Sequence, residues 1–447
     1  MAIINHPLIA LGIGILHGCA IGSCASAPPQ SSGFPPVPPQ PRYCKTPIDP
    51  IVRHFSPPVK PKYFFKPVGN QNEIAFVGEA PGTQEDQNFL LNTITGQITP
   101  IPGRLDPIGL FNTDLLSVPI DDDNGGTKMS FYDLRQLRAK GLATPPLYQS
   151  DESLMGRYQS LGTLRCVKNR VRFRIITDGN EGGNFRDFEV NFDAFPAKLR
   201  PLHPTRLLCS NLRDPKTHFM NHKLPMLSKN GQQVAFYDLA ARLMKVYQIH
   251  PQTGNCTLLA TPFPSRGDIG KFDFSPDSSQ AAFHYSDRNL DLNVQTFGRP
   301  AVQWQLRSAV FDFKKQAYQL LPFFGKGANT YYPAFLDQQH ILTLQLTDDQ
   351  LEFIEVDLSR LPYFAKTQIE NLVHLTNEEF APFQALSDRF TEQCYLDTLR
   401  STRANRILGL LALDETQCLE LAHDSSRSHP ELFEVYASTC KKLQRKN

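Results

Sequence analysis

The segment 271–287 alternates apolar and polar residues, stops at a cluster of turn-forming residues, and then becomes apolar again. Phe272 and Phe274 are separated by a polar residue, which is the period of a strand with one buried face. The sequence Ser-Pro-Asp-Ser-Ser at 275–279 is typical of a tight turn, because proline presets φ while Ser and Asp side chains bond to the local backbone. Apolar residues return at 281–285, so the segment predicts a strand, a turn and a second strand.

Copies of this pattern recur along the chain. The clearest is 224–238, with Asn230-Gly231 at the turn, and 332–344 is a weaker copy with Asp337 at the turn. Three further segments keep the rhythm with altered turns. In the six units together, the strand after the turn begins near Ile74, Leu116, Val171, Val234, Ala281 and Ile341. A spacing of roughly 40 to 60 residues is that of a four-stranded propeller blade with long loops.

These repeats predict an all-β fold, a six-bladed β-propeller over residues 63–375. Five or seven blades, and a β-sandwich of regular hairpins, are the alternatives. The Ser-Pro-Asp turn between apolar strands resembles the repeat of TolB-type (WD40-like) propellers, whose blades carry an apolar-x-apolar-Ser-Pro-Asp-Gly turn before an apolar strand. In TolB the propeller docks a partner lipoprotein. TolB also has an α/β N-terminal domain for which this chain leaves no room, so that partner is not carried over.

From Thr376 the apolar period becomes helical, which predicts a small α-helical module over 376–447. Helices are expected at 387–400 and 406–413. Two capping boxes are expected, at 414–417 and at 428–431, each with an N-cap oxygen and an acid or amide three residues later.

The last helix is expected to place Leu432, Val435, Tyr436, Cys440 and Leu443 on one apolar face. A disulfide joining Cys418 to Cys440, or joining one of them to Cys394, is a hypothesis for this module.

Residues 1–24 resemble a bacterial lipoprotein signal. A short apolar stretch at 7–16 is too short to span a bilayer comfortably, and Cys19 and Cys24 each follow an aliphatic and a small residue at lipobox spacing. The resemblance implies acylation of Cys24 or Cys19, a membrane attachment through the lipid, and a location in the periplasm or at the cell surface. The absence of Lys and Arg before the apolar stretch departs from the pattern, and 25–27 is an alternative, ordinary cleavage site.

Proline-rich residues 25–62 predict an extended linker. The formal net charge is +2 with a single Trp, so neither the charge nor the aromatic content favours nucleic acid. The chain has 9 Cys but no Cys-x-x-Cys pair, and no phosphate-cradling loop, so we expect no cofactor.

One segment imitates a calcium-binding loop. Asp178, Asn180 and Glu189 match ligand positions one, three and twelve of an EF-hand, but Gly182 occupies position five and the flanks look like strands. The pattern therefore favours a solvated hairpin loop over a metal site. The acidic run at 121–126 has the same interpretation.

His218 and His222 have the spacing of a metal pair but lack the Glu of a His-Glu-x-x-His motif. We assign no catalytic residue from the sequence. The predicted function is a non-enzymatic, exported scaffold that binds protein partners at the cell envelope. The alternatives are an enzyme that processes envelope polysaccharide or peptide on one propeller face, and a structural subunit of an envelope assembly.

Overall fold

The computed structural model describes residues 51–447 with gaps. The residues outside the description are 1–50, 70–71, 83–84, 105–106, 111–112, 122–126, 150–158, 178–182, 205, 214–221, 239–242, 263–268, 287–305, 322–328, 348–349, 362, 367–376, 394–412 and 445–447.

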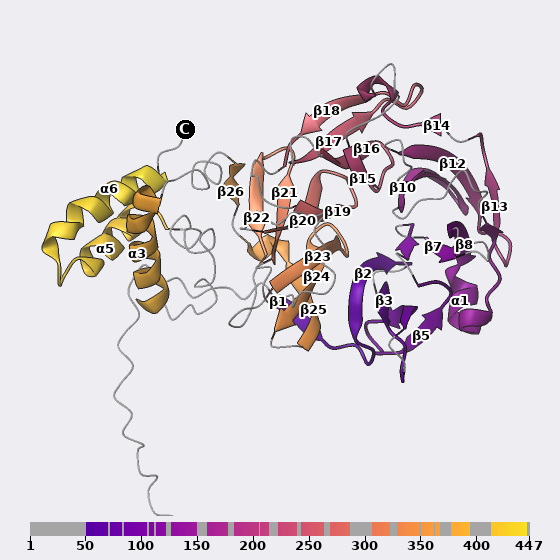
Figure 1. The fold of residues 1–447 in the computed structure, drawn as a ribbon, viewed down its shortest axis with the longest axis horizontal. Helices are drawn as coiled ribbons and strands as arrows, with labels where there is room; N and C mark the ends of the chain where they lie inside the picture. The colour runs from indigo at the N-terminus through magenta and orange to yellow at the C-terminus, as the bar shows by residue number, and fades with distance from the viewer. Residues whose placement is uncertain are drawn as a thin grey trace, which may run out of the picture. The chain divides into compact units, whose positions relative to one another are not determined.

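Six antiparallel sheets form the blades of a ring (Figure 1). Blade 1 holds β2 (Pro61–Val68), β3 (Glu73–Glu79), β4 (Asp86–Asn92) and β5 (Ile98–Ile101). Blade 2 holds β6 (Ile108–Gly109), β7 (Leu115–Asp121), β8 (Thr127–Asp133) and β9 (Tyr148–Gln149). Blade 3 holds β10 (Gln159–Val167), β11 (Arg170–Thr177), β12 (Asn184–Asn191), β13 (Lys198–Pro201) and β14 (Arg206–Leu207).

Blade 4 holds β15 (His222–Leu227), β16 (Gln233–Asp238), β17 (Leu243–Ile249) and β18 (Cys256–Ala260). Blade 5 holds β19 (Ile269–Phe274), β20 (Gln280–Ser286), β21 (Leu306–Asp312), β22 (Ala317–Leu320) and β26 (Phe364–Ala365). Blade 6 holds β23 (Asn329–Phe335), β24 (His340–Thr347), β25 (Gln350–Asp357) and β1 (Ile51–Phe55). A short helix, α1 (Leu134–Lys140), follows β8.

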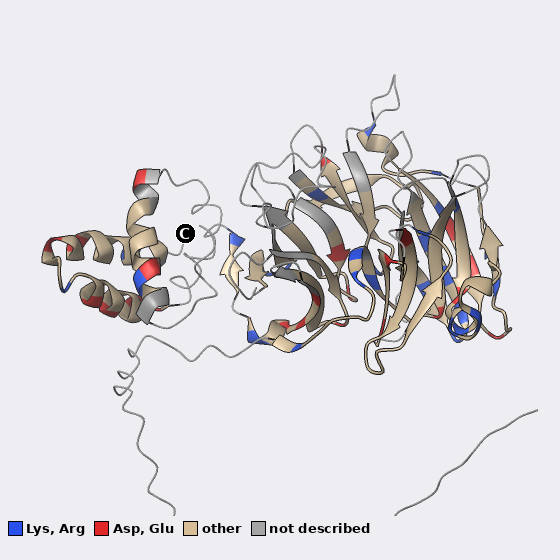
Figure 2. Ribbon diagram, turned by 60° about the horizontal axis from the view of Figure 1, so that its bottom comes forward, with Lys and Arg blue, Asp and Glu red and all other residues tan. Residues whose placement is uncertain are grey.

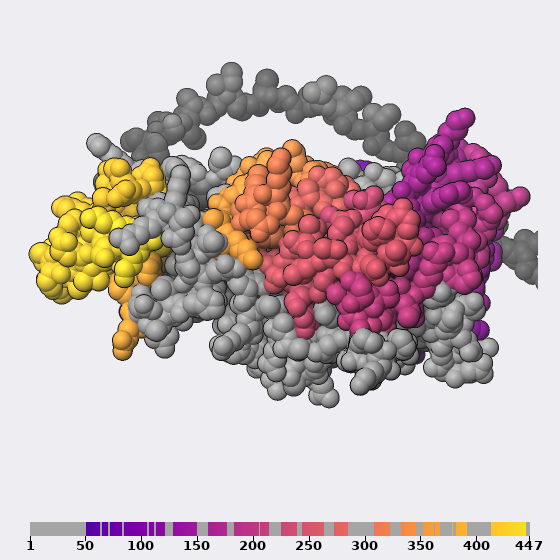
Figure 3. All heavy atoms as spheres, turned by 90° about the horizontal axis from the view of Figure 1, so that it is seen from above, coloured from indigo at the N-terminus to yellow at the C-terminus, as the bar shows by residue number. Residues whose placement is uncertain are grey.

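Two kinds of contact close the ring, one between the inner strands of neighbouring blades and one between the facing sides of the blades. The first strands of the six blades contact one another in the order β2, β6, β10, β15, β19, β23 and back to β2. Six buried apolar clusters lie between consecutive blades, one for each of the six interfaces. In the space-filling view, segments of neighbouring colour accordingly lie side by side along the ring (Figure 3). The predicted all-β propeller and its count of six blades are confirmed.

The Ser-Pro-Asp turn has the hydrogen bonds that its sequence predicts. The Ser275 hydroxyl donates to Asp277 Oδ1 at 2.7 Å and accepts the N–H of Gln280 at 3.0 Å. In blade 4, the Ser228 hydroxyl donates to Asn230 Oδ1 at 2.7 Å and likewise accepts the backbone N–H five residues on, at 2.9 Å. The two turns are therefore the same structure, in which a buried hydroxyl satisfies the backbone group that begins the next strand.

The last blade is completed by β1, the first strand that the structure describes. β1 pairs with β25 in antiparallel register, with His54 opposite Ile354 and Phe55 opposite Phe353. Arg53 Nε also donates to Glu355 Oε2 at 2.5 Å. This strand lies within the segment 25–62 that composition assigned to a linker, so the propeller begins earlier in the chain than residue 63.

The C-terminal module contains α3 (Asn377–Gln393), α5 (Glu415–Ser425) and α6 (Phe433–Gln444), preceded by a 3₁₀ turn at Pro430–Leu432. A buried cluster with members from all three helices forms its core. The capping box at Asp414 is confirmed, since Asp414 Oδ1 accepts the Gln417 N–H at 2.8 Å and the Gln417 side chain accepts the Asp414 N–H at 3.1 Å.

Three expectations for this module need correction. The box at Ser428 is wrong, because His429 is the N-cap of the 3₁₀ turn and no side chain caps it. Val435 is 43 % exposed rather than part of the buried face. The first helix begins at Asn377 instead of Ser387. The second expected helix, at 406–413, lies outside the described residues except for Leu413.

Two disulfides join cysteines in the part of the chain that the structure describes. Cys418 and Cys440 join α5 to α6 with a Cα–Cα distance of 5.7 Å. Cys209 and Cys256 join the end of blade 3 to β18 of blade 4 with a Cα–Cα distance of 4.8 Å. Cys166 is an exposed free thiol.

Removing β1 is expected to weaken the whole propeller. A chain starting at residue 57 should lose about 2–4 kcal/mol of unfolding free energy relative to a chain starting at residue 50, because it gives up one strand's hydrogen bonds and the packing of Phe55 on Phe353. Urea denaturation of the two truncated proteins measures this difference. Equal midpoints would show that ring closure does not need β1.

The disulfide in the helical module is expected to stabilise it by about 3 kcal/mol, because it closes a loop of 22 residues in the unfolded chain. The double variant C418A/C440A should therefore unfold its helices at a lower temperature by circular dichroism. C166A, which removes an exposed free thiol, is the control and should unfold like the wild type. Alkylation of Cys418 and Cys440 in the unreduced native protein would contradict the assignment.

Candidate functional site

Three charged side chains meet at the centre of the ring and form the Asp273 cluster, consisting of Asp273, Lys66 and Lys229. Asp273 Oδ1 lies 3.1 Å from Lys66 Nζ and 2.9 Å from Lys229 Nζ. Asp273 Oδ2 accepts the backbone N–H of Phe335 at 2.9 Å. One carboxylate therefore connects β2 of blade 1, the β15–β16 turn of blade 4, β19 of blade 5 and β23 of blade 6.

Burial and charge act in opposite directions on this carboxylate. Asp273 is only 6 % exposed, and burial alone would raise its pKa. The ammonium groups of Lys229 and Lys66 and the bond from Phe335 outweigh burial, so the pKa of Asp273 lies below its usual value. For Lys229, burial lowers the pKa of the ammonium and the Asp273 carboxylate opposes that change. The cluster is thus an ion-pair network held together by its own partners.

The repeat itself marks the position of Asp273 as unusual. By strand register, Asp273 lies opposite Ala282, as Met226 lies opposite Ala235 and Lys66 lies opposite Ala75. Asp273 and Lys66 thus occupy, in their blades, the strand position that the apolar Met226 occupies in blade 4. Its partners lie 207 and 44 residues away in sequence, so only the ring brings them together.

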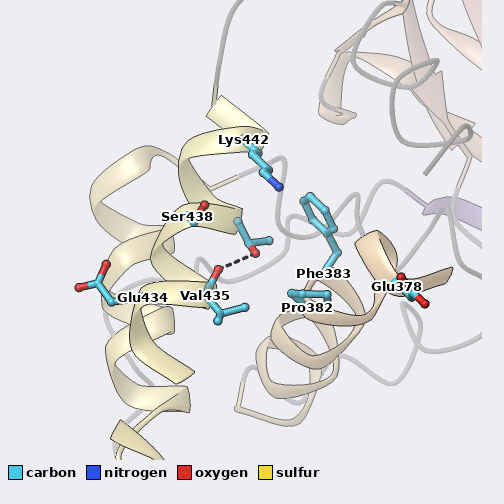
Figure 4. A pocket seen from close by; sticks show the side chains of 8 residues that line it. Glu378, Pro382, Phe383, Glu434, Val435, Ser438 and Lys442 are labelled. Atoms are coloured by element: carbon cyan, nitrogen blue, oxygen red, sulfur yellow. Dashed lines mark hydrogen bonds between the residues drawn. The ribbon is translucent and has the colours of Figure 1, made fainter. Parts of the chain in front are cut away.

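A second feature is an open groove of about 540 Å³ in the helical module (Figure 4). α3 contributes Glu378, Pro382 and Phe383, and α6 contributes Glu434, Val435, Ser438, Thr439 and Lys442. We call it the α3–α6 groove. Its lining is chemically mixed, with apolar, hydroxyl-bearing and charged residues.

Solved structures resemble the chain in fold, whereas it matches no protein-family model and no curated protein sequence. TolB from Acinetobacter baumannii is 11% identical, with a TM-score of 0.34 over 64% of this chain and 63% of that chain. An oligogalacturonate lyase from Vibrio parahaemolyticus is 13% identical, with a TM-score of 0.38 over 67% and 90%. Regucalcin, a calcium-binding protein from Agrobacterium tumefaciens, is 13% identical, with a TM-score of 0.37 over 68% and 95%. At these values the similarities carry no inference about activity or ligand.

Most of the predicted site residues lie outside the part of the chain that the structure describes. This holds for Cys19, Cys24, Asp178, Asn180 and Cys394. The lipoprotein signal and the acylated cysteine therefore stay predictions. Within the described ranges, no helix has both the length and the apolar character needed to cross a membrane.

Glu189 is the described member of the calcium hypothesis. It lies within β12, where its carboxylate accepts hydrogen bonds from Arg172 Nε at 3.0 Å and Arg200 Nη2 at 2.8 Å. These two arginines, Arg200 first, lower the pKa of Glu189. Because two guanidinium groups already bind this carboxylate, these contacts favour a role for Glu189 within the sheet over a role as a calcium ligand. Among the described residues, no group of three or more His, Cys, Asp or Glu has the arrangement of a metal site.

Of the paired histidines, His222 begins β15 and His218 lies outside the described residues. In the acidic run 121–126, only Asp121 is described, at the end of β7. Elsewhere, basic and acidic residues are interspersed over the described strands (Figure 2), consistent with a net charge of +2.

Breaking the Asp273 cluster is expected to cost stability in a pH-dependent way. D273N should lower the unfolding free energy by about 3 kcal/mol at neutral pH, because two partly buried ammonium groups lose their counter-charge. D114N is the matched control, since the Asp114–Arg138 pair is more than one-third exposed on both sides and should cost less than about 1 kcal/mol.

The pH profile separates the charge effect from a simple packing defect. In the wild type, the Asp273 contribution is present above the unfolded-state pKa of about 4 and disappears as pH falls through the lower folded-state pKa. The D273N variant should not show this loss of unfolding free energy as pH falls. Because the pKa of Lys229 is lowered, stability rises as pH approaches the unfolded lysine value of about 10.4, and more steeply in D273N. Urea denaturation from pH 3 to pH 10 measures both effects, and parallel profiles would contradict this account.

Proposed function

We propose that this protein is a non-enzymatic scaffold, exported to the bacterial cell envelope and anchored there through a lipid, that binds another protein. The observation that carries the proposal is the α3–α6 groove, an open surface on a module whose helices are cross-linked by a disulfide. A rigid surface loses less conformational entropy on binding than a flexible one, which favours recognition.

The disulfides also support export. Disulfides persist in oxidising compartments such as the periplasm and are rare in the cytosol. Here one pair joins two blades and the other joins two helices, so both parts of the protein carry one. The signal-like segment 1–24 and its Cys19 or Cys24 give the proposed route and anchor.

The polar chemistry of the ring centre supports a structural role for the propeller. The Asp273 carboxylate contacts two ammonium groups and accepts a hydrogen bond from a backbone N–H, each within 3.1 Å. A group fixed in this way connects blades and contributes to rigidity. The propeller is then the platform, and the helical module carries the binding surface.

Cross-linking in cells that make the protein tests the proposal. Affinity purification of the full-length protein followed by mass spectrometry should recover a small, reproducible set of envelope proteins. A V435D variant, altered in the groove, should lose the partner, whereas V167D, altered at an exposed valine of the propeller, should keep it. If an intact and exported bait enriches no protein, the binding function is wrong and an enzyme acting on envelope polymer becomes the better hypothesis.

A further inference from the structure

We propose that blades 1, 2 and 3 carry a membrane-contacting surface, in which apolar side chains at turns enter an anionic lipid interface while Lys and Arg side chains bind the headgroups. The inference goes beyond the proposed function and does not depend on it, because the α3–α6 groove lies on the helical module. Three features carry it: exposed apolar residues on one face of the ring, hydrogen bonds that join their turns, and basic residues around them.

One face of the ring exposes large apolar side chains at the turns of blades 1 to 3, which are neighbours (Figure 1). Each of these blades is an antiparallel meander whose last strands lead to the first strand of the next blade. The connections from first to second and from third to fourth strand therefore share one face. Exposed there are Ile94 in blade 1, Leu142 in the 3₁₀ turn after α1, and Val167 and Phe195 in blade 3. One exposed apolar residue is ordinary, whereas several on one face indicate an interaction surface.

Hydrogen bonds join the two turns of blade 3. The Asn169 side chain, in the turn between β10 and β11, donates to Asp193 Oδ1 in the turn between β12 and β13 at 2.8 Å. The Asn169 carbonyl accepts the backbone N–H of Phe192 at 2.8 Å. Val167 and Phe195 thus lie on adjacent turns that are fixed to each other.

The helix α1 connects blade 3 to blades 2 and 1 on the same face. Arg135, in its first turn, donates to the carbonyl of Ala194 at 3.3 Å, and its guanidinium lies 5.2 Å from the centre of the Phe195 ring. Arg138 Nη2 donates to the Glu73 carboxylate in β3 of blade 1 at 2.6 Å. These contacts make the turns of the three blades one continuous, preformed surface, which loses little conformational entropy on binding.

Basic residues without an acidic partner surround the apolar ones. Exposed Lys and Arg side chains that form no ion pair with another described residue are Lys140, Arg165, Lys168, Arg170 and Lys198. Acidic and basic residues are interspersed over the strands, but 159–207 contain nine Lys and Arg against five Asp and Glu, a net charge of +4. Since the whole chain has a net charge of +2, the remainder is net negative. Anionic headgroups attract such a local excess of positive charge.

The arrangement of the apolar residues favours a lipid surface over a protein partner. They lie on four separate connections, one in blade 1, one in blade 2 and two in blade 3. A protein interface is built around a closely packed apolar core. A lipid interface instead accepts separate apolar side chains at the boundary between headgroups and acyl chains, where long basic side chains reach the phosphates.

Vesicle flotation tests the inference with the full-length chain carrying C19S and C24S, which removes both candidate acylation sites. This parent protein should bind vesicles of phosphatidylcholine and phosphatidylglycerol in equal amounts at least tenfold more tightly than vesicles of phosphatidylcholine alone. Added salt should weaken the binding, because it screens the attraction between the basic residues and the headgroups.

Two charge-reversal variants separate this surface from the overall charge. K168E/K198E should weaken binding to the mixed vesicles at least tenfold, because each basic residue near an anionic membrane contributes roughly a fivefold factor in affinity. K60E/R104E is the matched control. It changes the net charge equally, but Lys60 and Arg104 are exposed in connections between blades, on the opposite face of the ring. It should weaken the binding less than threefold.

Apolar variants and a fluorescent label test insertion. L142S and F195S should each weaken binding at least threefold at high salt, where burial of apolar surface is the main contribution. L258S is the control, because Leu258 is 54 % exposed against 57 % for Leu142 and lies on β18 of blade 4. A polarity-sensitive fluorophore on the free thiol of Cys166, next to Val167, should brighten when mixed vesicles are added. The C166A variant, treated in the same way, gives the background.

Every other outcome contradicts the inference. Equal binding to the two kinds of vesicle, or binding to neither, would show that the surface does not recognise an anionic membrane. Equal loss in a variant and in its matched control would place the contact elsewhere on the protein. If fluorescein-labelled polyglutamate binds in a way that K168E/K198E abolishes, and vesicles do not bind, the occupant is an acidic protein instead. Circular dichroism of each variant checks that it has kept the fold of the parent protein.

Discussion

Burial of both faces of every blade is the constraint on which this structure depends. A four-stranded antiparallel sheet with two apolar faces is stable only when each face is covered. Here each of the six buried clusters lies between the facing sides of two adjacent blades. Each blade therefore needs two neighbours, and blade 1 needs blade 6. A ring satisfies that requirement, whereas a row of blades would leave two apolar faces in water. The pairing of β1 with β25 follows from the same need, because it fastens the ring across the one interface that chain continuity does not supply.

The local part of this fold was predictable from sequence. The strands predicted near Ile74, Val171 and Ala281 begin at Glu73, Arg170 and Gln280, because alternation and turn chemistry act over a few residues. Long-range features were not predictable. Arg53 and Glu355 are 302 residues apart, and Cys209 and Cys256 are 47 apart, so no local pattern marks either pair. The capping box predicted at Ser428 does not form, because a 3₁₀ turn begins at Pro430.

The two candidate sites differ in how their charges are satisfied. At the ring centre, Asp273 is almost fully buried, so its charge requires partners and has them. At the groove, Glu378 and Glu434 are exposed to water. Buried charge thus contributes to structure in the propeller, whereas the charges of these two glutamates on the helices are solvated. The repeat marks the position of Asp273 but not its two lysine partners, because tertiary packing brings those together.

The position of β1 in the sequence has a consequence for biosynthesis. The ribosome makes β1 before the other described strands, but its partner β25 emerges only after Gln350 has been added. Until then β1 has no partner strand. The growing chain also exposes an apolar face at each end of the unfinished ring. The closed state is therefore reached only after synthesis of almost the whole chain, and prematurely terminated products expose the surfaces that proteases and chaperones recognise.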